Sequence, residues 1–272
     1  MPREHHRTAI AIRTKDVEPR LPELLLRLAG QTLEASEIVV VDNFSSKKHL
    51  EDMQHLLSSA KTTLFGSSVS VKLVPITDRD FSHPYSTNLG VSVANSDLVC
   101  ITNGHSFPCS DDWLGNGVAH FENSDVAGVG GYSTAHEDGT VWEKLGYDWG
   151  WKRCNEVTKA YTKDSHFSTV NCILRKSLWE EYPFDEKLPD EIPETRRFGG
   201  EDYDWAQEMR ARGYRIIVEP RFSVSHSHSE TGPQLLTKYL VWHRIRKNIR
   251  SLKRPRKSYT RLEGAKPLYY DL

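Results

Sequence analysis

Short apolar runs alternate with amphipathic segments along the first part of the chain. The apolar runs predict β-strands over residues 8–12, 37–42, 71–76 and 97–102. Between them, apolar residues recur at helical spacing over residues 21–33, 48–59 and 86–94. The second run, Glu37-Ile-Val-Val-Val-Asp42, is nearly all apolar, as in a parallel strand covered on both faces. This alternation predicts βαβ units, and hence an α/β fold with a doubly wound sheet.

The second half of the chain is less regular. Residues 126–131 and 214–218 predict two further strands, and residues 233–252 predict a helix. Residues 188–197 are rich in proline and charge, which predicts a mobile loop. No linker is clear enough to divide the chain into two globular units.

Composition narrows the class of protein. With 272 residues and a formal net charge of −1, the chain suits one large α/β domain and not a general nucleic-acid binder. No run approaches the roughly 20 apolar residues of a membrane helix. The N-terminus has no apolar signal segment. The four cysteines form no Cys-x-x-Cys pair, so we interpret them as reduced thiols of a cytoplasmic protein.

Polar residues stand where several predicted strands end. In doubly wound sheets, ligands bind at the carboxyl ends of the strands. The residues at those ends are Arg13-Thr14, Asp42-Asn43, Asp78 and Asn103-Gly-His105.

Two adjacent acids, Glu201 and Asp202, follow Gly199-Gly200 at the start of another predicted helix. Acids in a first turn suit the helix dipole. An acid at a helix entrance, beside backbone that a ligand can approach closely, is also where a general base could stand. The helix alone does not choose between these two interpretations.

Taken in order, these motifs resemble the family 2 glycosyltransferases and their GT-A fold, a Rossmann-like doubly wound mixed sheet. The resemblance covers roughly residues 8–230 and is closest to bacterial rhamnosyltransferase-like members. The matching segments are Ala11-Ile-Arg-Thr14, Val39-Val-Val-Asp-Asn-Phe-Ser-Ser46, residues 81–90, Ile101-Thr-Asn-Gly-His-Ser-Phe-Pro108 with Trp113-Leu114, Asn171 with Arg175-Lys-Ser177, Phe184-Asp-Glu186, and the Gly-Gly-Glu-Asp helix.

The resemblance implies a nucleotide-sugar donor carrying UDP, GDP or dTDP. The residue matching Asp42 would bond the base, since a carboxylate accepts hydrogen bonds from base N–H groups. The other residues implied on the nucleotide side are Arg13, Thr14, Asn43, Asp78 and Asn103. Asn88 would open a helix near the sugar. The alternatives are a polar turn after a buried strand at Asp42 and ordinary helix packing at Asn88.

The chain departs from the family at residues 103–105. The family usually has Asp-x-Asp there, which holds Mg²⁺ or Mn²⁺ on the diphosphate, whereas this chain has Asn103-Gly-His105. Some retaining GalNAc-transferases use Asp-x-His with a distant histidine, which here would be His226 or His228. Because alternate residues of a strand point to opposite faces, we expect only one of them to face a metal, and we favour His226. The alternative is metal-independent binding, with Lys or Arg neutralising the diphosphate.

The resemblance gives the acidic helix a catalytic role. In inverting members, the carboxylate matching Asp202 deprotonates the acceptor hydroxyl, and Glu201 would orient the acceptor or the backbone. Two alternatives remain open: a retaining transferase, suggested by the histidine-containing motif, and a catalytically silent nucleotide-sugar-binding domain.

Acceptor contacts are expected in the middle of the chain. The resemblance places Trp149 and Trp151, in a segment with three tryptophans, together with Asn171 and Gly200, near the sugar and a glycan, lipid-linked or small-molecule acceptor. A second small core explains the tryptophans equally well.

The C-terminal part is basic. We assign residues 1–232 to the catalytic domain and residues 233–272 to a basic helix and tail. Leu240, Ile245, Ile249 and Leu252 fall close to one face of that helix. Such a helix can make peripheral contact with an anionic membrane or pack on the domain with solvated charges, and we favour packing.

Overall fold

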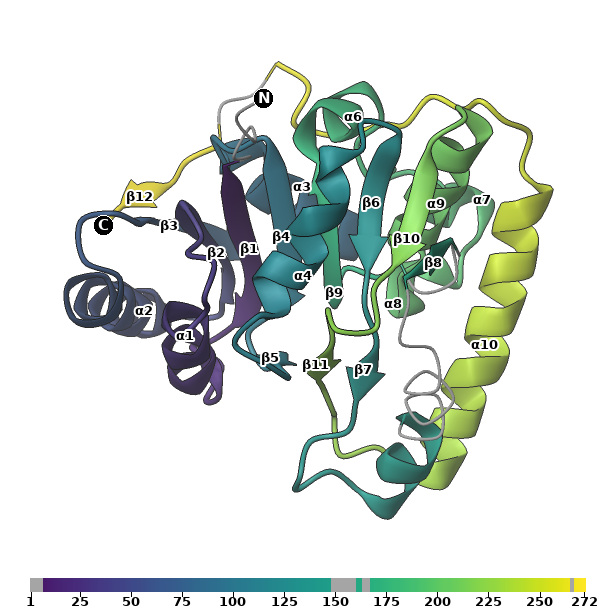
Figure 1. Cartoon of the computed structure of the whole chain (residues 1–272). Coiled ribbons are helices and arrows are strands. Elements are labelled where there is room, and N and C mark those ends of the chain that lie inside the picture. The colour runs from purple at the N-terminus through teal and green to yellow at the C-terminus, as the bar shows by residue number, and fades with distance from the viewer. Residues whose placement is uncertain (1–6, 148–159, 163–166, 265–266) are drawn as a thin grey trace.

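A nine-stranded mixed sheet forms the centre of the molecule (Figure 1). The structure is a computed structural model that describes residues 7–147, 160–162, 167–264 and 267–272. The strand order is β12-β3-β2-β1-β4-β9-β6-β10-β8. The strands are β1 (Thr8–Lys15), β2 (Glu37–Phe44), β3 (Ser70–Thr77), β4 (Leu98–Asn103), β6 (Val126–Gly130), β8 (Tyr161–Thr162), β9 (Asn171–Arg175), β10 (Arg215–Val218) and β12 (Tyr270–Asp271).

The first four strands of the chain are mutually parallel, as their apolar sequences predict. The strand β1 lies between β2 and β4, and β2 pairs with β3. The order reverses direction at β9, which runs antiparallel to both β4 and β6. The α/β fold with a mixed, mostly parallel sheet is therefore confirmed.

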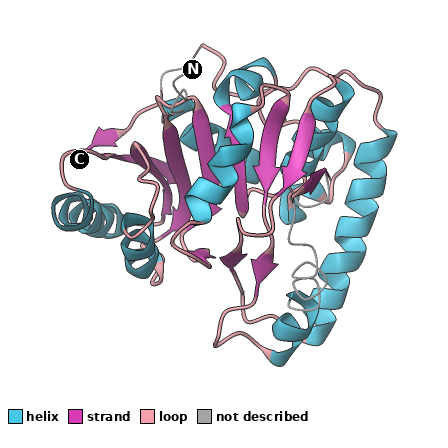
Figure 2. Cartoon of the chain, viewed as in Figure 1, coloured by secondary structure: helices cyan, strands magenta, loops and turns pink. Residues whose placement is uncertain are grey.

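Helices cover both faces of the sheet (Figure 2). On one face, α1 (Leu21–Ala29), α2 (Lys47–Ala60) and α4 (Trp113–Val118) contribute to one buried apolar cluster. On the other face, a second cluster joins α3 (His83–Val93), α6 (Lys176–Glu181) and α9 (Glu201–Ala211). Two short helical turns cover residues Lys61–Phe65 and Ala119–Glu122.

A small second sheet extends from the carboxyl ends of the large one. It consists of β5 (Phe107–Pro108), β11 (Val224–Ser225) and β7 (Ser133–Thr134), in that order. Along the chain, β5 follows β4, β7 follows β6, and β11 follows β10. They therefore carry the chain past the sheet edge at which ligands were expected.

The predicted mobile loop at residues 188–197 is wrong. The segment forms two short helices, α7 (Leu188–Glu191) and α8 (Thr195–Phe198). Leu188 and Ile192 are buried in a third apolar cluster. Because these apolar residues anchor the segment, its prolines and charges do not make it a loop.

The helix α10 (Gly232–Ser251) packs on the domain, as we favoured. It contacts α8 and α9 through Val241, Ile245 and Ile249 (Figure 1). Leu240, which we placed on the same face, is 57% exposed. The tail after α10 crosses back to pair β12 with β3. Among the described residues, no helix has the length and apolarity needed to cross a membrane.

Candidate functional site

A cavity of about 1200 Å³ opens at the carboxyl ends of β1, β2 and β4. Its other walls come from α8, α9, α10 and the histidines that follow β11. Pockets for one small ligand typically measure about 300–1000 Å³. This cavity is therefore large enough for two substrates.

Unpartnered polar atoms gather at this edge of the sheet. Within the described residues, nine buried side-chain N or O atoms lack a hydrogen-bond partner. Six of the nine belong to Arg13 (Nε), Thr14 (Oγ1), Asp42 (both carboxylate oxygens), Asn43 (Oδ1) and His105 (Nε2). Buried polar groups are nearly always paired, so such a concentration indicates a site whose partners are ligand atoms.

Arg13 connects the strand ends to the acidic helix. It stands beside Asn103 in the β1–β4 register, and its Nη2 donates to Asn103 Oδ1 at 3.0 Å and to Thr169 Oγ1 at 3.1 Å. The backbone N–H of Thr169 in turn donates to Asp202 Oδ2 at 3.1 Å. These contacts hold the guanidinium of Arg13 between Asn103, on the expected nucleotide side, and Asp202, the expected general base.

Asp42 lies just beneath the cavity wall and does not line it. The side chain is fully buried, and burial followed by the charge of Asp16 raises its pKa to about 6. The backbone of Val17 opposes this shift, although neither carboxylate oxygen of Asp42 has a hydrogen-bond partner. Asp16 and Val17 adopt φ of 51° and 56°, a left-handed conformation that is rare for a β-branched residue. A strained turn therefore covers an unpartnered carboxylate.

Asn43 and Asp78 do line the cavity, next to Lys15. The Asn43 Nδ2 donates to Asp78 Oδ1 at 3.0 Å, and Lys15 Nζ pairs with the same oxygen at 2.8 Å. The ends of β2 and β3 are therefore linked in a polar wall.

The acids Glu201 and Asp202 begin α9 at the cavity. Gly199 and Gly200 precede them with φ of 73° and 132°, which L side chains rarely adopt. A Cβ on Gly200 would also lie 2.9 Å from Ile245 of α10. Glycine is therefore needed both for the turn and for the contact between the two helices.

Glu201 and Asp202 differ in their surroundings. Glu201 is buried, and burial, with the neighbouring Asp202 charge, raises its pKa to about 7 against the attraction of Arg13. Asp202 is half-buried and faces the cavity. His83 also lines the cavity, and burial and Arg13 lower its pKa to about 4, which keeps the ring neutral.

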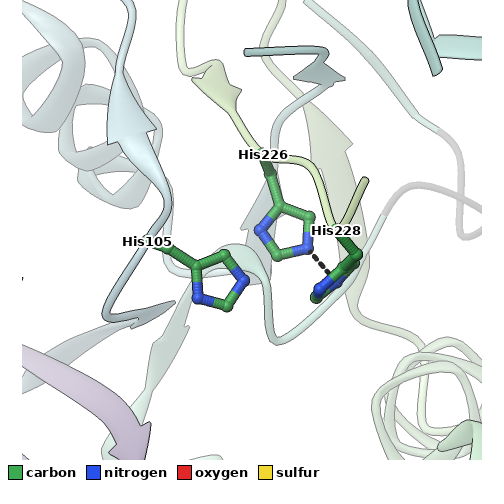
Figure 3. A group of neighbouring side chains, drawn as sticks. All are labelled: His105, His226 and His228. Atoms are coloured by element: carbon green, nitrogen blue, oxygen red, sulfur yellow. Dashed lines mark hydrogen bonds between the residues drawn. The ribbon is translucent and has the colours of Figure 1, made fainter. Parts of the chain in front are cut away.

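Three histidines that line the cavity lie close to one another. Figure 3 shows His105, His226 and His228. One ring nitrogen from each of His105, His226 and His228 lies within 4.8 Å of the others. The Nε2 atoms of His226 and His228 are 2.9 Å apart. We expected strand alternation to turn one of this pair away. That expectation is wrong, because β11 ends at Ser225 and both histidines follow the strand.

Outer contacts orient two of these rings. His105 Nδ1 lies 3.2 Å from Glu18 Oε2, and His226 Nδ1 lies 3.0 Å from Ser106 Oγ. Burial is the main cause that lowers the pKa of all three histidines, to about 4 for His228. Neutral imidazoles with one nitrogen held by an outer partner and the other turned inward are suited to a transition metal. The residues present therefore fit a divalent metal ion.

Other expected site residues lie elsewhere. Asn88 is fully buried and bonds the backbone of Phe184 and the indole of Trp179. Asn171 is equally buried and bonds the Trp113 indole and the Phe222 carbonyl. Both amides hold the core together and neither lines the cavity, so the expected sugar contacts are not what the structure shows.

Trp149 and Trp151 lie outside the described residues. Gly200 lines the cavity as expected. The sequence interpretation missed Glu18 and His83 and placed only one of the two late histidines at the cluster. For His83, its position beside the Ser82 helix cap in a motif after β3 was an available signal. For Glu18, no sequence pattern pointed to His105.

Comparisons with known proteins agree on the fold. Residues 9–182 match the sequence profile described as Glycosyl transferase family 2. No protein with curated annotation matches the sequence significantly. The mannosyltransferase PcManGT from Pyrobaculum calidifontis, in complex with GDP-Man and Mn²⁺, has a TM-score of 0.60 at 18% identity, over 92% of this chain and 66% of that one.

A second structure, GalNAc-T7 with UDP, GalNAc and Mn²⁺, has a TM-score of 0.60 at 16% identity. The match covers 84% of this chain and 44% of that one. This chain thus spans less than two thirds of either protein.

Proposed function

Since this chain belongs to glycosyl transferase family 2, we propose that it moves a sugar from a nucleoside diphosphate donor to an acceptor hydroxyl, with inversion at the anomeric carbon. The observation that carries this proposal is the gathering of six unpartnered buried polar atoms at the strand ends. The same cavity is also lined by the carboxylate of Asp202. The two similar structures bear GDP-Man or UDP with Mn²⁺, which is consistent with such a donor.

The donor would bind at the ends of β1, β2 and β4. The Asp42 carboxylate can accept from a base N–H, provided that the turn at Val17 moves aside. Backbone strain of this kind stores about 1–3 kcal/mol per residue, which opening would release. Asn43, Asp78 and Thr14 line the same side and supply further polar contacts.

A divalent metal would be held by His105, His226 and His228, with Glu18 orienting His105. When bound, it would offset negative charge on the diphosphate as the sugar leaves. Three imidazoles favour a later transition metal and are tolerated by Mn²⁺, whereas Mg²⁺ prefers oxygen ligands.

Asp202 is proposed as the general base. It faces the cavity at the start of α9, where the backbone N–H groups of Thr169 and Tyr203 donate to its Oδ2 and Oδ1. Each carboxylate oxygen can accept a second hydrogen bond, so the acceptor hydroxyl can still donate to Asp202. The acceptor oxygen forms the new bond to the anomeric carbon, its proton passes to Asp202, and the nucleoside diphosphate leaves. Arg13 would lie between the two substrates, and its guanidinium attracts the negative charge of both acids.

A panel of UDP-, GDP- and dTDP-sugars tests the donor class. A ligand at about 100 times its Kd raises the free energy of unfolding by about 2.7 kcal/mol, which a thermal melt detects. We expect one nucleotide class to stabilise the protein, more strongly with Mn²⁺ than with EDTA. Absence of stabilisation by every member, with and without metal, would argue against the donor proposal.

The histidine cluster also supports a second candidate, a retaining transferase, because a histidine-containing metal motif resembles that of some retaining GalNAc-transferases. The anomeric proton coupling of the product, measured by NMR, separates the two. Retention would remove Asp202 as the base for inversion and would leave the donor site unchanged.

A further inference from the structure

Exposed apolar side chains concentrate at the mouth of the cavity. Among the described residues, twelve large hydrophobic side chains are exposed. Six of these twelve fall in two short segments, and we call them the mouth patch: Val141, Trp142, Leu145, Leu236, Tyr239 and Leu240. Single exposed apolar side chains are normal, but six of twelve gathered in one place indicate a binding surface.

The two segments of the mouth patch are in contact. Residues 141–147 are helical and pack against the start of α10. A Cβ on Gly232 would lie 3.0 Å from the Trp142 ring, and one on Gly146 would lie 3.5 Å from the Tyr239 hydroxyl. On α10, Leu236, Tyr239 and Leu240 are spaced by three and four residues, which places them on one side.

The mouth patch is continuous with the cavity. Leu145 and Tyr239 belong to the patch and also line the cavity. A chain-like apolar group bound on the patch can therefore extend into the cavity along Leu145 and Tyr239.

Two cations stand on the same wall as Asp202. Arg197 of α8 and Arg246 of α10 line the cavity and lie over the rings of Phe198 and Tyr203, at 5.3 and 5.7 Å. Neither has a carboxylate partner within the described part of the chain. Lys238, by contrast, is paired with Glu230 at 3.0 Å. Arg197 and Arg246 therefore keep their charge for a ligand.

We propose that the acceptor is amphiphilic: its hydroxyl meets Asp202, an anionic phosphate- or pyrophosphate-type group contacts Arg197 and Arg246, and an apolar chain lies on the mouth patch. This assignment rests on the proposed transferase function and specifies the class of its acceptor. Planar guanidinium groups bind phosphate with two parallel hydrogen bonds, which a sugar hydroxyl does not offer. Charge and apolar surface occur here in the order that such an acceptor requires.

Soluble alkyl phosphates test the proposal without any donor. Octyl, decyl and dodecyl phosphate are titrated below their micelle concentrations by calorimetry, beside inorganic phosphate and decyl maltoside. Full burial of one methylene strengthens binding about fourfold, so a chain lying on an open face gains about twofold per methylene. We expect this rise with chain length, and weaker binding of inorganic phosphate and of the neutral maltoside.

Matched variants separate the two parts of the surface. Arg246→Met and Arg197→Met should each weaken decyl phosphate binding about tenfold, because each removes charged hydrogen bonds. Leu240→Ser should flatten the dependence on chain length. The controls are Arg244→Met and Arg196→Met, which remove exposed cations outside the cavity lining, and Leu26→Ser, which removes a leucine that is 60% exposed on α1. All three should bind as the parent does.

Four results would overturn the proposal. Equal binding of inorganic phosphate would exclude the apolar part, and equal binding of decyl maltoside would exclude the anionic part. Sedimentation as a dimer that Leu240→Ser dissociates would show that a second copy covers the patch. Binding to vesicles of phosphatidylcholine with phosphatidylglycerol that persists in both cavity arginine variants would indicate a membrane-docking face. Failure of the proposed transferase function would appear separately, as absent nucleotide-sugar binding.

Discussion

One helix carries two pairs of acids with opposite environments. At the start of α9, Glu201 and Asp202 face a cavity, and both attract the guanidinium of Arg13. Further along the same helix, Asp204 and Glu208 are fully buried. These inner acids are surrounded by donors from elsewhere in the chain.

The inner pair is satisfied by the C-terminal tail. Arg254 donates to Asp204 at 2.7 Å and to Glu208 at 3.0 Å, and Tyr182 donates to Asp204 at 2.7 Å. Burial still raises the pKa of Asp204, but Arg254 opposes that shift. The position of an acid on the helix therefore does not decide its role. What distinguishes the two pairs is that side-chain donors surround the inner acids, whereas Asp202 accepts backbone N–H groups and still faces the cavity.

Removing the proposed base, Asp202, should have the largest effect. Asp202→Asn keeps the shape and removes the proton acceptor, so kcat should fall about 10²–10⁴-fold. Donor consumption with acceptor measures the rate, and nucleotide-induced stabilisation should stay near the parent value. A fully active variant would place the base elsewhere.

Removing an inner partner should act on stability instead. Arg254→Met removes the arginine paired with buried Asp204 and one of the two arginines paired with Glu208, the other being Arg212. Breaking a buried pair typically costs about 3–5 kcal/mol. Urea unfolding measures the loss. Activity per folded molecule should remain, and a variant that keeps its stability would show that the tail arginine is dispensable.

In the histidine cluster, the comparison concerns Glu18, a residue that does not bind the proposed metal but contacts one of its ligands, His105. Glu18→Gln removes the carboxylate that holds His105 Nδ1, and losses of this kind weaken metal binding about 10–100-fold. Titration with Co²⁺, followed by visible absorption, measures affinity without activity. Glu34→Gln, an exposed acid outside the cavity lining, is the control, and equal affinities in the two variants would deny Glu18 this role.

Glu201, the buried acid at the start of α9, should make the stability of the protein depend on pH. The pKa of Glu201 is raised to about 7 from 4.5, so the folded state holds its proton more tightly than the unfolded state. Its contribution to stability is complete below about pH 4.5 and is lost as pH rises through about 7. Glu201→Gln should therefore match the parent near pH 4.5 and melt a few degrees higher at pH 8. An offset that does not change with pH would contradict the shift.

The smallest effect concerns the turn over Asp42. Val17→Gly removes left-handed strain, which should stabilise the free protein by about 1 kcal/mol. If that turn must open before the base of the nucleotide can bind Asp42, stabilising the closed turn by about 1 kcal/mol should weaken nucleotide binding by Val17→Gly about fivefold. Ser229→Gly, at φ 58°, gives similar relief away from Asp42, and binding measured in EDTA should not change. Tighter binding by Val17→Gly would contradict an opening turn.

The sequence predicted what local pattern controls. The apolar runs located the ends of β1, β2 and β4, and therefore the placement of Arg13, Thr14 and Asn103 at one edge. The start of α9 was located in the same way, because glycines and acids mark a helix entrance.

Contacts between segments far apart in the sequence could not be predicted from local pattern. Asn88 and Asn171 have the residue type of a binding group, but only the fold shows that indoles and carbonyls already use their amides. His228 was misplaced because the strand before it is two residues long. The pairing of Arg254 with Asp204 spans 50 residues and has no local signature.

The tail that completes α9 also imposes an order on synthesis. A ribosome makes the helix before it makes Arg254 and Arg256, whose side chain and backbone N–H, respectively, satisfy the inner acids. Until those residues emerge, Asp204 lacks its arginine partner and Glu208 has only the first of its two arginine partners, Arg212, so α9 becomes fully stabilised only after α10 has been made. A chain truncated before Arg254 would keep most of its sheet and would hold α9 less firmly.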